Sequence, residues 1–261
     1  MTQALLYHDI VPEGEYASSG FVSPDANIYK FSVAEFERHL FAIQSRHPAP
    51  AVSAAVALAS PEALLLTFDD GGSSAIQWTA DILERFGHVG HFFITTDYVG
   101  AAGFLSRADI AALARRGHII GSHSCSHPVL MSKCASQQIE REWRESVDVL
   151  SNIVGTPVTI ASVPGGSYSR AVGQAAARAG LRVLFTSEPV SSIGEVNGCA
   201  LIGRYSIQRG TSSQTAAALA GGDWLAVFKQ ALYWNLKKVI KNMGGNAWIE
   251  LRKKILSRRL R

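Results

Sequence analysis

The segment Leu64-Leu65-Leu66-Thr67-Phe68-Asp69-Asp70-Gly71 decides the fold class, and it places two adjacent carboxylates at the end of an apolar run. A short apolar run that stops at a glycine turn is typical of a buried β-strand. Comparable runs recur near residues 4–8, 91–95, 118–122, 158–162, 182–186 and 201–207. Because helical patterns separate them, the sequence predicts an α/β fold with parallel strands and crossover helices.

Helix signals lie between these strands. Residues 33–46 follow the capping-box sequence Ser32-Val33-Ala34-Glu35, residues 107–116 lie between Ser106 and Gly117, and residues 171–179 end at Gly180. The alanine-rich residues 51–63 give no clear assignment. Polar residues gather at the predicted carboxyl ends of strands, the edge at which α/β folds build their sites. They are His8, Asp69, Asp70, Asp97, His123, Glu188 and Arg204.

Length and composition favour one large α/β domain, since 261 residues with 47% hydrophobic content can bury a full core. The three cysteines, Cys125, Cys134 and Cys199, show no paired spacing, so we expect reduced thiols and a cytoplasmic location. The first eight residues resemble a strand and not a secretion signal, and no apolar stretch is long enough to cross a bilayer.

The net charge of +4 is divided unevenly along the chain. Residues 229–261 contain ten Lys or Arg and one acid, Glu250, which gives about +9, so the remainder carries about −5. A basic tail of this kind predicts contact with an anionic partner, such as a membrane surface on the inner face of the membrane, and no nucleic acid is expected because no recognition module accompanies it.

Two apolar stripes run through this C-terminal region. The first predicts a helix that packs on the main domain, and Gly244-Gly245 ends it. The second lies beside a dense basic face, so packing and interfacial binding to anionic lipid stay open as alternatives for it. The first stripe comprises Leu225, Phe228, Leu232, Leu236, Val239 and Met243, and the second comprises Trp248, Leu251 and Ile255.

A second motif, His123-Ser124-Cys125-Ser126-His127, lies after another apolar run. On one helical turn, residues four apart share a face, so both imidazoles could reach one ion together with Asp70. Three protein ligands and one open position are typical of catalytic zinc, and Asp69 would then be free to act as a base. The alternative is that the histidines cap a helix and that the two aspartates begin a turn. Cys125 is expected to be a buried thiol.

With these motifs, residues 4–210 resemble the polysaccharide deacetylase family, the carbohydrate esterases that share the NodB homology domain. Residues 67–71 match the first motif, residues 123–127 match the second, and Val163-Pro164-Gly165-Gly166 matches the third more weakly. The resemblance implies a distorted, incomplete (β/α) barrel, with residues 1–222 as the catalytic domain and 223–261 as basic amphipathic helices. It also implies a zinc-like ion on Asp70, His123 and His127, with Co²⁺, Ni²⁺ or Fe²⁺ as alternatives.

The resemblance further implies residue roles, and the chain departs from the family pattern at three of them. Gly165 is the expected backbone donor to the oxyanion. Ser162 stands where the family has an arginine that orients the base, so Arg204 is the candidate for that cation. No histidine follows His127, so His8 is the candidate general acid, and Glu188 is the candidate for the fourth-motif aspartate.

The sequence therefore predicts a metal-dependent hydrolase that removes N-acetyl groups from an N-acetylated sugar in a bacterial surface polysaccharide or its precursor. Two alternatives stay open. One is a hydrolase of a small non-peptide amide with the same metal site. The other is a non-catalytic glycan-binding or assembly protein that keeps the fold.

Overall fold

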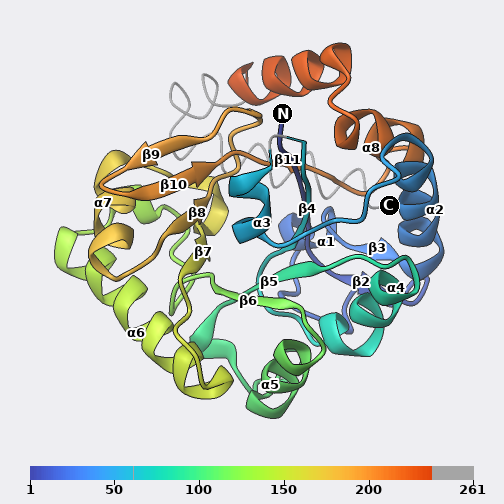
Figure 1. Cartoon of the computed structure of the whole chain (residues 1–261). Helices are drawn as coiled ribbons and strands as arrows, with labels where there is room; N and C mark the ends of the chain where they lie inside the picture. Colours follow the sequence, from blue (N-terminus) through green and yellow to red (C-terminus); the bar gives the residue numbers. More distant parts are fainter. Residues whose placement is uncertain (61, 237–261) are drawn as a thin grey trace.

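The computed structural model of the protein describes residues 1–60 and 62–236, and in this part of the chain a nine-stranded sheet curls into an incomplete (β/α) barrel (Figure 1). The strand order is β11-β1-β4-β5-β6-β7-β8-β10-β9. All neighbours are parallel except β9 and β10. The strands are β1 (Gln3–Tyr7), β4 (Leu64–Phe68), β5 (Gly90–Ile94), β6 (Ile119–Ser122), β7 (Ile160–Ser162), β8 (Val183–Phe185), β9 (Gly194–Val196), β10 (Cys199–Ile202) and β11 (Tyr205–Ser206).

The central strands are buried along their whole length because both faces of the sheet are covered. All five residues of β4 and all five of β5 are buried. Leu66 and Phe92 pack outward with the helices, whereas Leu65 and Phe93 pack inside the curl. This is the pattern expected of a parallel sheet that lies under crossover helices.

The predicted strands are confirmed within one or two residues, except for residues 201–207. That run divides into β10 and β11, because the chain turns at Gly203-Arg204 and leaves β8 to pair with β1. A side chain at Gly203 would collide with the Glu188 carbonyl oxygen, 2.4 Å from an added Cβ. The first strand, β1, pairs with both β4 and β11, so it lies next to the strand that forms one edge of the sheet.

The predicted helices are confirmed as α2 (Val33–Arg46), α5 (Arg107–Arg115) and α7 (Arg170–Arg178), and they cover the outside of the sheet with the others (Figure 1). The Ser32–Glu35 capping box is present at α2. The unassigned alanine-rich stretch contains α3 (Ala54–Ala59). The helices and strands that were not predicted include α1 (Pro24–Asn27), β2 (Ile10–Val11), β3 (Phe31–Ser32), α4 (Ala80–Arg85), α6 (Ser136–Val154), β9 (Gly194–Val196) and α8 (Ser213–Ala220).

A further helix spans residues 224–236, and the prediction of which side packs was wrong. Ala226 and Val227 pack on the core, and the Gln230 side-chain amide donates to the Ser206 carbonyl at 2.6 Å. The stripe expected to pack instead faces outward, because the smaller side chains allow the close approach to β11. Its members Leu225, Phe228, Leu232 and Leu236 are 42–58% exposed.

Predictions for residues 237–261, including the Gly244-Gly245 break and the Trp248 stripe, lie outside the described residues. The boundary at residues 222 and 223 also stays a prediction. Among the helices that the structure describes, none has both the length and the apolar character needed to span a membrane.

Candidate metal and catalytic site

The strand register places the predicted site residues side by side. Tyr7 of β1 is opposite Phe68 of β4, so His8 and Asp69 are the next residues on adjacent strands. Asp70 then adopts a left-handed conformation with φ of 76°, which aspartate tolerates better than most residues, and Gly71 follows with φ of 84°. The chain therefore reverses directly after the two carboxylates and holds them at the carboxyl edge of the sheet.

The two histidines of the second motif lie on an irregular loop, so the expectation of a helical turn was wrong. Ser124 and His127 both have positive φ, 66° and 57°, which interrupts any helix. The buried Glu142 of α6 fixes this loop: its carboxylate accepts hydrogen bonds from the Cys125 and Ser126 backbone N–H groups, each at 2.9 Å, and from the Ser126 hydroxyl at 2.6 Å. The imidazoles converge because this loop is held, not because of helical periodicity.

Asp70, His123 and His127 form a three-ligand cluster that fits a divalent metal ion. Their ligand atoms lie within 4.8 Å of one another, and Nε2 of each histidine is 3.4 Å from Asp70 Oδ1. That oxygen is buried and has no hydrogen-bond partner among the described residues. The His123 Nδ1–H donates to the Ser162 carbonyl at 2.9 Å, which leaves the Nε2 lone pair available to a metal.

Electrostatics keep the Asp70 carboxyl ionised. Burial by itself would raise its pKa, but His8 and the imidazoles of His123 and His127, whose Nε2 atoms lie 3.4 Å from Oδ1, outweigh burial and hold the pKa well below its usual range. One carboxylate and two imidazoles suit zinc, and also cobalt, nickel or ferrous iron.

Asp69 is held by a buried guanidinium. Arg204 is fully buried, and its Nη1 and Nη2 donate to the two Asp69 oxygens at 2.7 and 2.9 Å. The Ser162 hydroxyl donates to Asp69 Oδ2 at 3.1 Å and lies 2.6 Å from Arg204 Nη2. Burial would raise the pKa of Asp69, but the charge of Arg204, followed by that of His123, lowers it below its usual value. The carboxylate is therefore ionised and fixed in orientation.

The Arg204 guanidinium is itself anchored from several sides. It donates to the Thr186 carbonyl at 3.0 Å and to the Thr67 hydroxyl at 3.2 Å. It also packs over the rings of Phe93 and Phe185, 5.7 and 5.8 Å from their centroids. The turn between β10 and β11 thus supplies a cation to the end of β4, although the two positions are 135 residues apart.

His8 lies beside the carboxylates and stacks on Tyr29 with 4.4 Å between ring centroids. Burial lowers the pKa of His8, while the charges of Asp70, Asp69 and Asp9 act in the opposite direction. Its Nδ1 is buried without a hydrogen-bond partner among the described residues. The ring is therefore held near both aspartates with a ring nitrogen that can take part in proton transfer.

Gly165 and Glu188 lie on neighbouring loops at the same edge. Gly165 occupies the turn after β7 with φ of 57°, and it is exposed beside the Val129 carbonyl. Glu188 follows β8, its backbone carbonyl accepts from the Arg204 N–H at 2.9 Å, and it lines a cavity of about 190 Å³ with Trp234. Asp97, one of the polar residues expected at a strand end, is exposed, and its N–H donates to the Cys125 carbonyl at 3.0 Å.

Two residues with direct roles in the geometry were not predicted. Glu142 holds the histidine loop, and its only sequence signal is a charge inside the apolar stripe of α6 formed with Ile139, Trp143 and Leu150. Ser162 was seen only as the position of a missing arginine, whereas its hydroxyl joins Asp69 to Arg204 and its carbonyl orients His123.

The comparison with solved structures defines the class of fold. The Streptococcus pyogenes deacetylase PplD in complex with acetate superposes with a TM-score of 0.68 at 20% identity, over 82% of this chain and 95% of that chain. The chain therefore has the incomplete (β/α) barrel of deacetylases.

The sequence comparisons point to the same kind of protein. Residues 59–184, just under half of the chain, match the family model described as Polysaccharide deacetylase. The chain is 31% identical to the peptidoglycan-N-acetylmuramic acid deacetylase PdaA of Bacillus subtilis (strain 168) over 126 residues, 48% of this chain and 46% of that protein. It is 34% identical to a chitin deacetylase of Arthroderma benhamiae over 113 residues, 42% of this chain and 30% of that protein. It thus spans less than half the length of either relative.

Proposed function

We propose that the chain is a metal-dependent hydrolase that removes N-acetyl groups from an N-acetylated sugar. The observation that carries the proposal is the fully buried Arg204, whose two hydrogen bonds fix Asp69 beside the cluster of Asp70, His123 and His127. A structural ion pair would not need a cluster of one carboxylate and two imidazoles next to it. The relatives named as chitin and peptidoglycan deacetylases support an amide of an amino sugar as the substrate.

In this proposal the ligand cluster holds a divalent ion, with zinc as our choice, which would polarise the acetyl carbonyl and lower the pKa of water. Asp69 accepts a proton from the attacking water as the new C–O bond forms. Arg204 and Ser162 keep the Asp69 oxygens in place through that step. The Gly165 N–H donates to the developing oxyanion, which is the role of a preorganised backbone donor.

Breaking the C–N bond requires a proton on the departing nitrogen. We assign its delivery to His8, since its ring lies near both aspartates and has a buried Nδ1 without a partner among the described residues. Acetate and the free amino sugar are then the products, and the proton that Asp69 accepted balances the one that His8 donates. We assign Glu188 a supporting role, because the backbone carbonyl of Glu188 accepts a hydrogen bond from the backbone N–H of Arg204.

The proposed substrate is a bacterial surface polysaccharide or its precursor. The test is acetate release from a panel of N-acetylhexosamine oligosaccharides by metal-loaded protein, compared with chelated protein and with Asp69→Asn. Asp148→Asn is the matched control, because Asp148 is an exposed carboxylate on α6 that lies outside the cluster. Release that both Asp69→Asn and chelation abolish supports the proposal. Release from small amides alone supports the amide hydrolase, and metal binding without any hydrolysis supports a glycan-binding protein.

A further inference from the structure

The helix of residues 224–236 carries large apolar side chains on the side that faces away from the barrel. Phe228 and Leu232 are each 58% exposed, Leu236 is 57% exposed and Leu225 is 42% exposed. We call these four residues the outer face. Their spacing of three and four places them on one stripe of the helix. The opposite side of the same helix is already packed, through Ala226, Val227 and Gln230.

An apolar stripe on the solvent side of a packed helix is unusual, since a contiguous exposed apolar patch normally marks an interaction site. Two aromatic residues flank the stripe: Trp224 is 75% exposed and Tyr233 is 52% exposed. Lys229 is exposed between them on the same side. Apolar residues bordered by tryptophan, tyrosine and lysine are the composition of helices that lie in a membrane interface.

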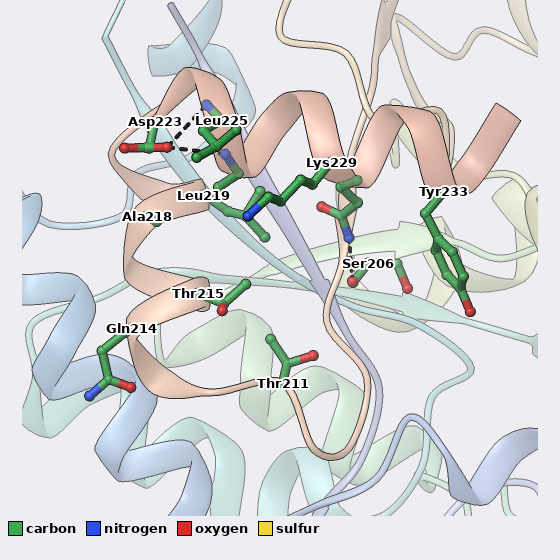
Figure 2. A pocket seen from close by; sticks show the side chains of 12 residues that line it. Ser206, Thr211, Gln214, Thr215, Ala218, Leu219, Asp223, Leu225, Lys229 and Tyr233 are labelled. Atoms are coloured by element: carbon green, nitrogen blue, oxygen red, sulfur yellow. Dashed lines mark hydrogen bonds between the residues drawn. The ribbon is translucent and has the colours of Figure 1, made fainter. Parts of the chain in front are cut away.

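A groove of about 440 Å³ opens beside the outer face, between α8 and the helix of residues 224–236 (Figure 2). Leu225, Lys229 and Tyr233 line it, together with Leu219 and Ala226 on its apolar side. Figure 2 shows the Lys229 side chain extended along the groove toward α8. The apolar outer face and the groove therefore form one continuous surface with a cation at the boundary between them.

We propose that this surface docks onto an anionic lipid membrane. Charge complementarity selects the partner: residues 229–261 contain ten Lys or Arg and one acid in the sequence. A second copy carries the same sequence excess of about +9 in this segment, and like charges repel, whereas an anionic lipid surface attracts basic residues. Nucleic acid phosphates would bind the basic residues, but nucleic acid has no aliphatic surface to cover a stripe of leucine and phenylalanine.

Docking there would bring the candidate site close to the membrane. Trp234 lies on the packed side of the helix, and its ring is 3.1 Å from the position of a Cβ added to Gly166. Gly166 belongs to the turn after β7 at the carboxyl edge of the sheet, next to Gly165. One end of the docking helix therefore contacts the loops that surround the site, so a glycan attached to lipid could reach them.

The test is co-sedimentation of the full chain with vesicles of equimolar phosphatidylcholine and phosphatidylglycerol. The double variant Phe228→Ser/Leu232→Ser removes half of the outer face, and we expect its partition coefficient to fall by at least about tenfold. Phe41→Ser is the matched control, because Phe41 is 68% exposed on α2, and it should bind as the wild type does. Binding to vesicles of phosphatidylcholine alone should be weaker for every variant that binds.

Three results would overturn the proposal: no wild-type binding to the anionic vesicles, equal binding of the wild type and the double variant, or a wild-type dimer on size exclusion that the double variant converts to a monomer. The last would assign the surface to a second copy. Because both side chains are exposed, the melting temperature of the double variant should equal that of the wild type, and this measurement separates lost docking from lost folding. None of these measurements depends on hydrolytic activity.

Discussion

Replacing Arg204 with lysine keeps the buried positive charge but removes the planar fork that holds both Asp69 oxygens. Arg204 donates to Oδ1 at 2.7 Å and to Oδ2 at 2.9 Å, and its remaining N–H groups are used by Ser162, Thr67 and Thr186. A lysine ammonium has three donors and a shorter reach, so it cannot satisfy this set. We therefore expect Asp69 to lose its fixed orientation in Arg204→Lys.

The size of the effect follows from the number of hydrogen bonds lost. A hydrogen bond to a charged group contributes about 1.5–3 kcal/mol, and Arg204→Lys loses at least one of the two to Asp69. If that energy holds the base in its reactive position, kcat falls by about ten- to a hundredfold, at 1.36 kcal/mol per tenfold. Arg204 is 0% exposed, so its side chain cannot touch a substrate, and KM should change little.

The assay is steady-state acetate release from an N-acetylhexosamine oligosaccharide, with metal content measured on the same samples. Arg182→Lys is the control, because Arg182 is exposed directly before β8. Metal content should be unchanged in both variants, since Arg204 contacts none of the three ligand side chains through a described hydrogen bond. A kcat within about threefold of the wild type in Arg204→Lys would refute a positioning role, because it corresponds to less than one hydrogen bond.

Three other measurements test separate parts of the structure. Asp70→Asn should reduce zinc affinity, measured by isothermal titration, by at least about tenfold, because it removes the charged ligand, and unchanged affinity would place the ion elsewhere. Glu142→Leu should also weaken zinc binding, because it removes all three hydrogen bonds that hold the histidine loop; an equal affinity would mean that the loop needs no such support. Burial lowers the pKa of His91 to about 4 from 6.5. The unfolded chain therefore binds this proton first, and stability is lost as pH falls from 6.5 to 4, by up to about 3 kcal/mol for this group. His91→Asn should show a smaller loss in urea unfolding across that range, and the same slope in both proteins would contradict the assignment.

The sheet and the main helices could be predicted because their signals are local. Residues 64–68 are apolar and end in a turn, and the Ser32–Glu35 capping box starts α2 at the expected residue. The α6 helix was missed although it is the longest helix among the described residues, since its start at Ser136 lacks a side-chain cap. Its apolar stripe also contains Glu142, which breaks the hydrophobic pattern.

The site was predictable in its residue types but not in its geometry. Asp70, His123 and His127 come together as their motifs indicated, yet the loop between the histidines is not helical. The partnership of Arg204 with Asp69 depends on the turn at Gly203, where the chain passes from β8 to β1, and no local pattern records this change. The packed side of residues 224–236 was mispredicted for a related reason: periodicity locates an apolar stripe but does not say what covers it.

The most direct test of the account is a zinc titration of chelated protein while acetate release from an N-acetylhexosamine oligosaccharide is followed, with Asp69→Asn titrated in parallel. We predict that wild-type activity rises in proportion to bound zinc and stops rising at one equivalent, whereas Asp69→Asn binds the same amount of zinc and releases no acetate. Activity that does not depend on zinc or another divalent ion, or an Asp69→Asn protein that hydrolyses as the wild type does, would contradict it.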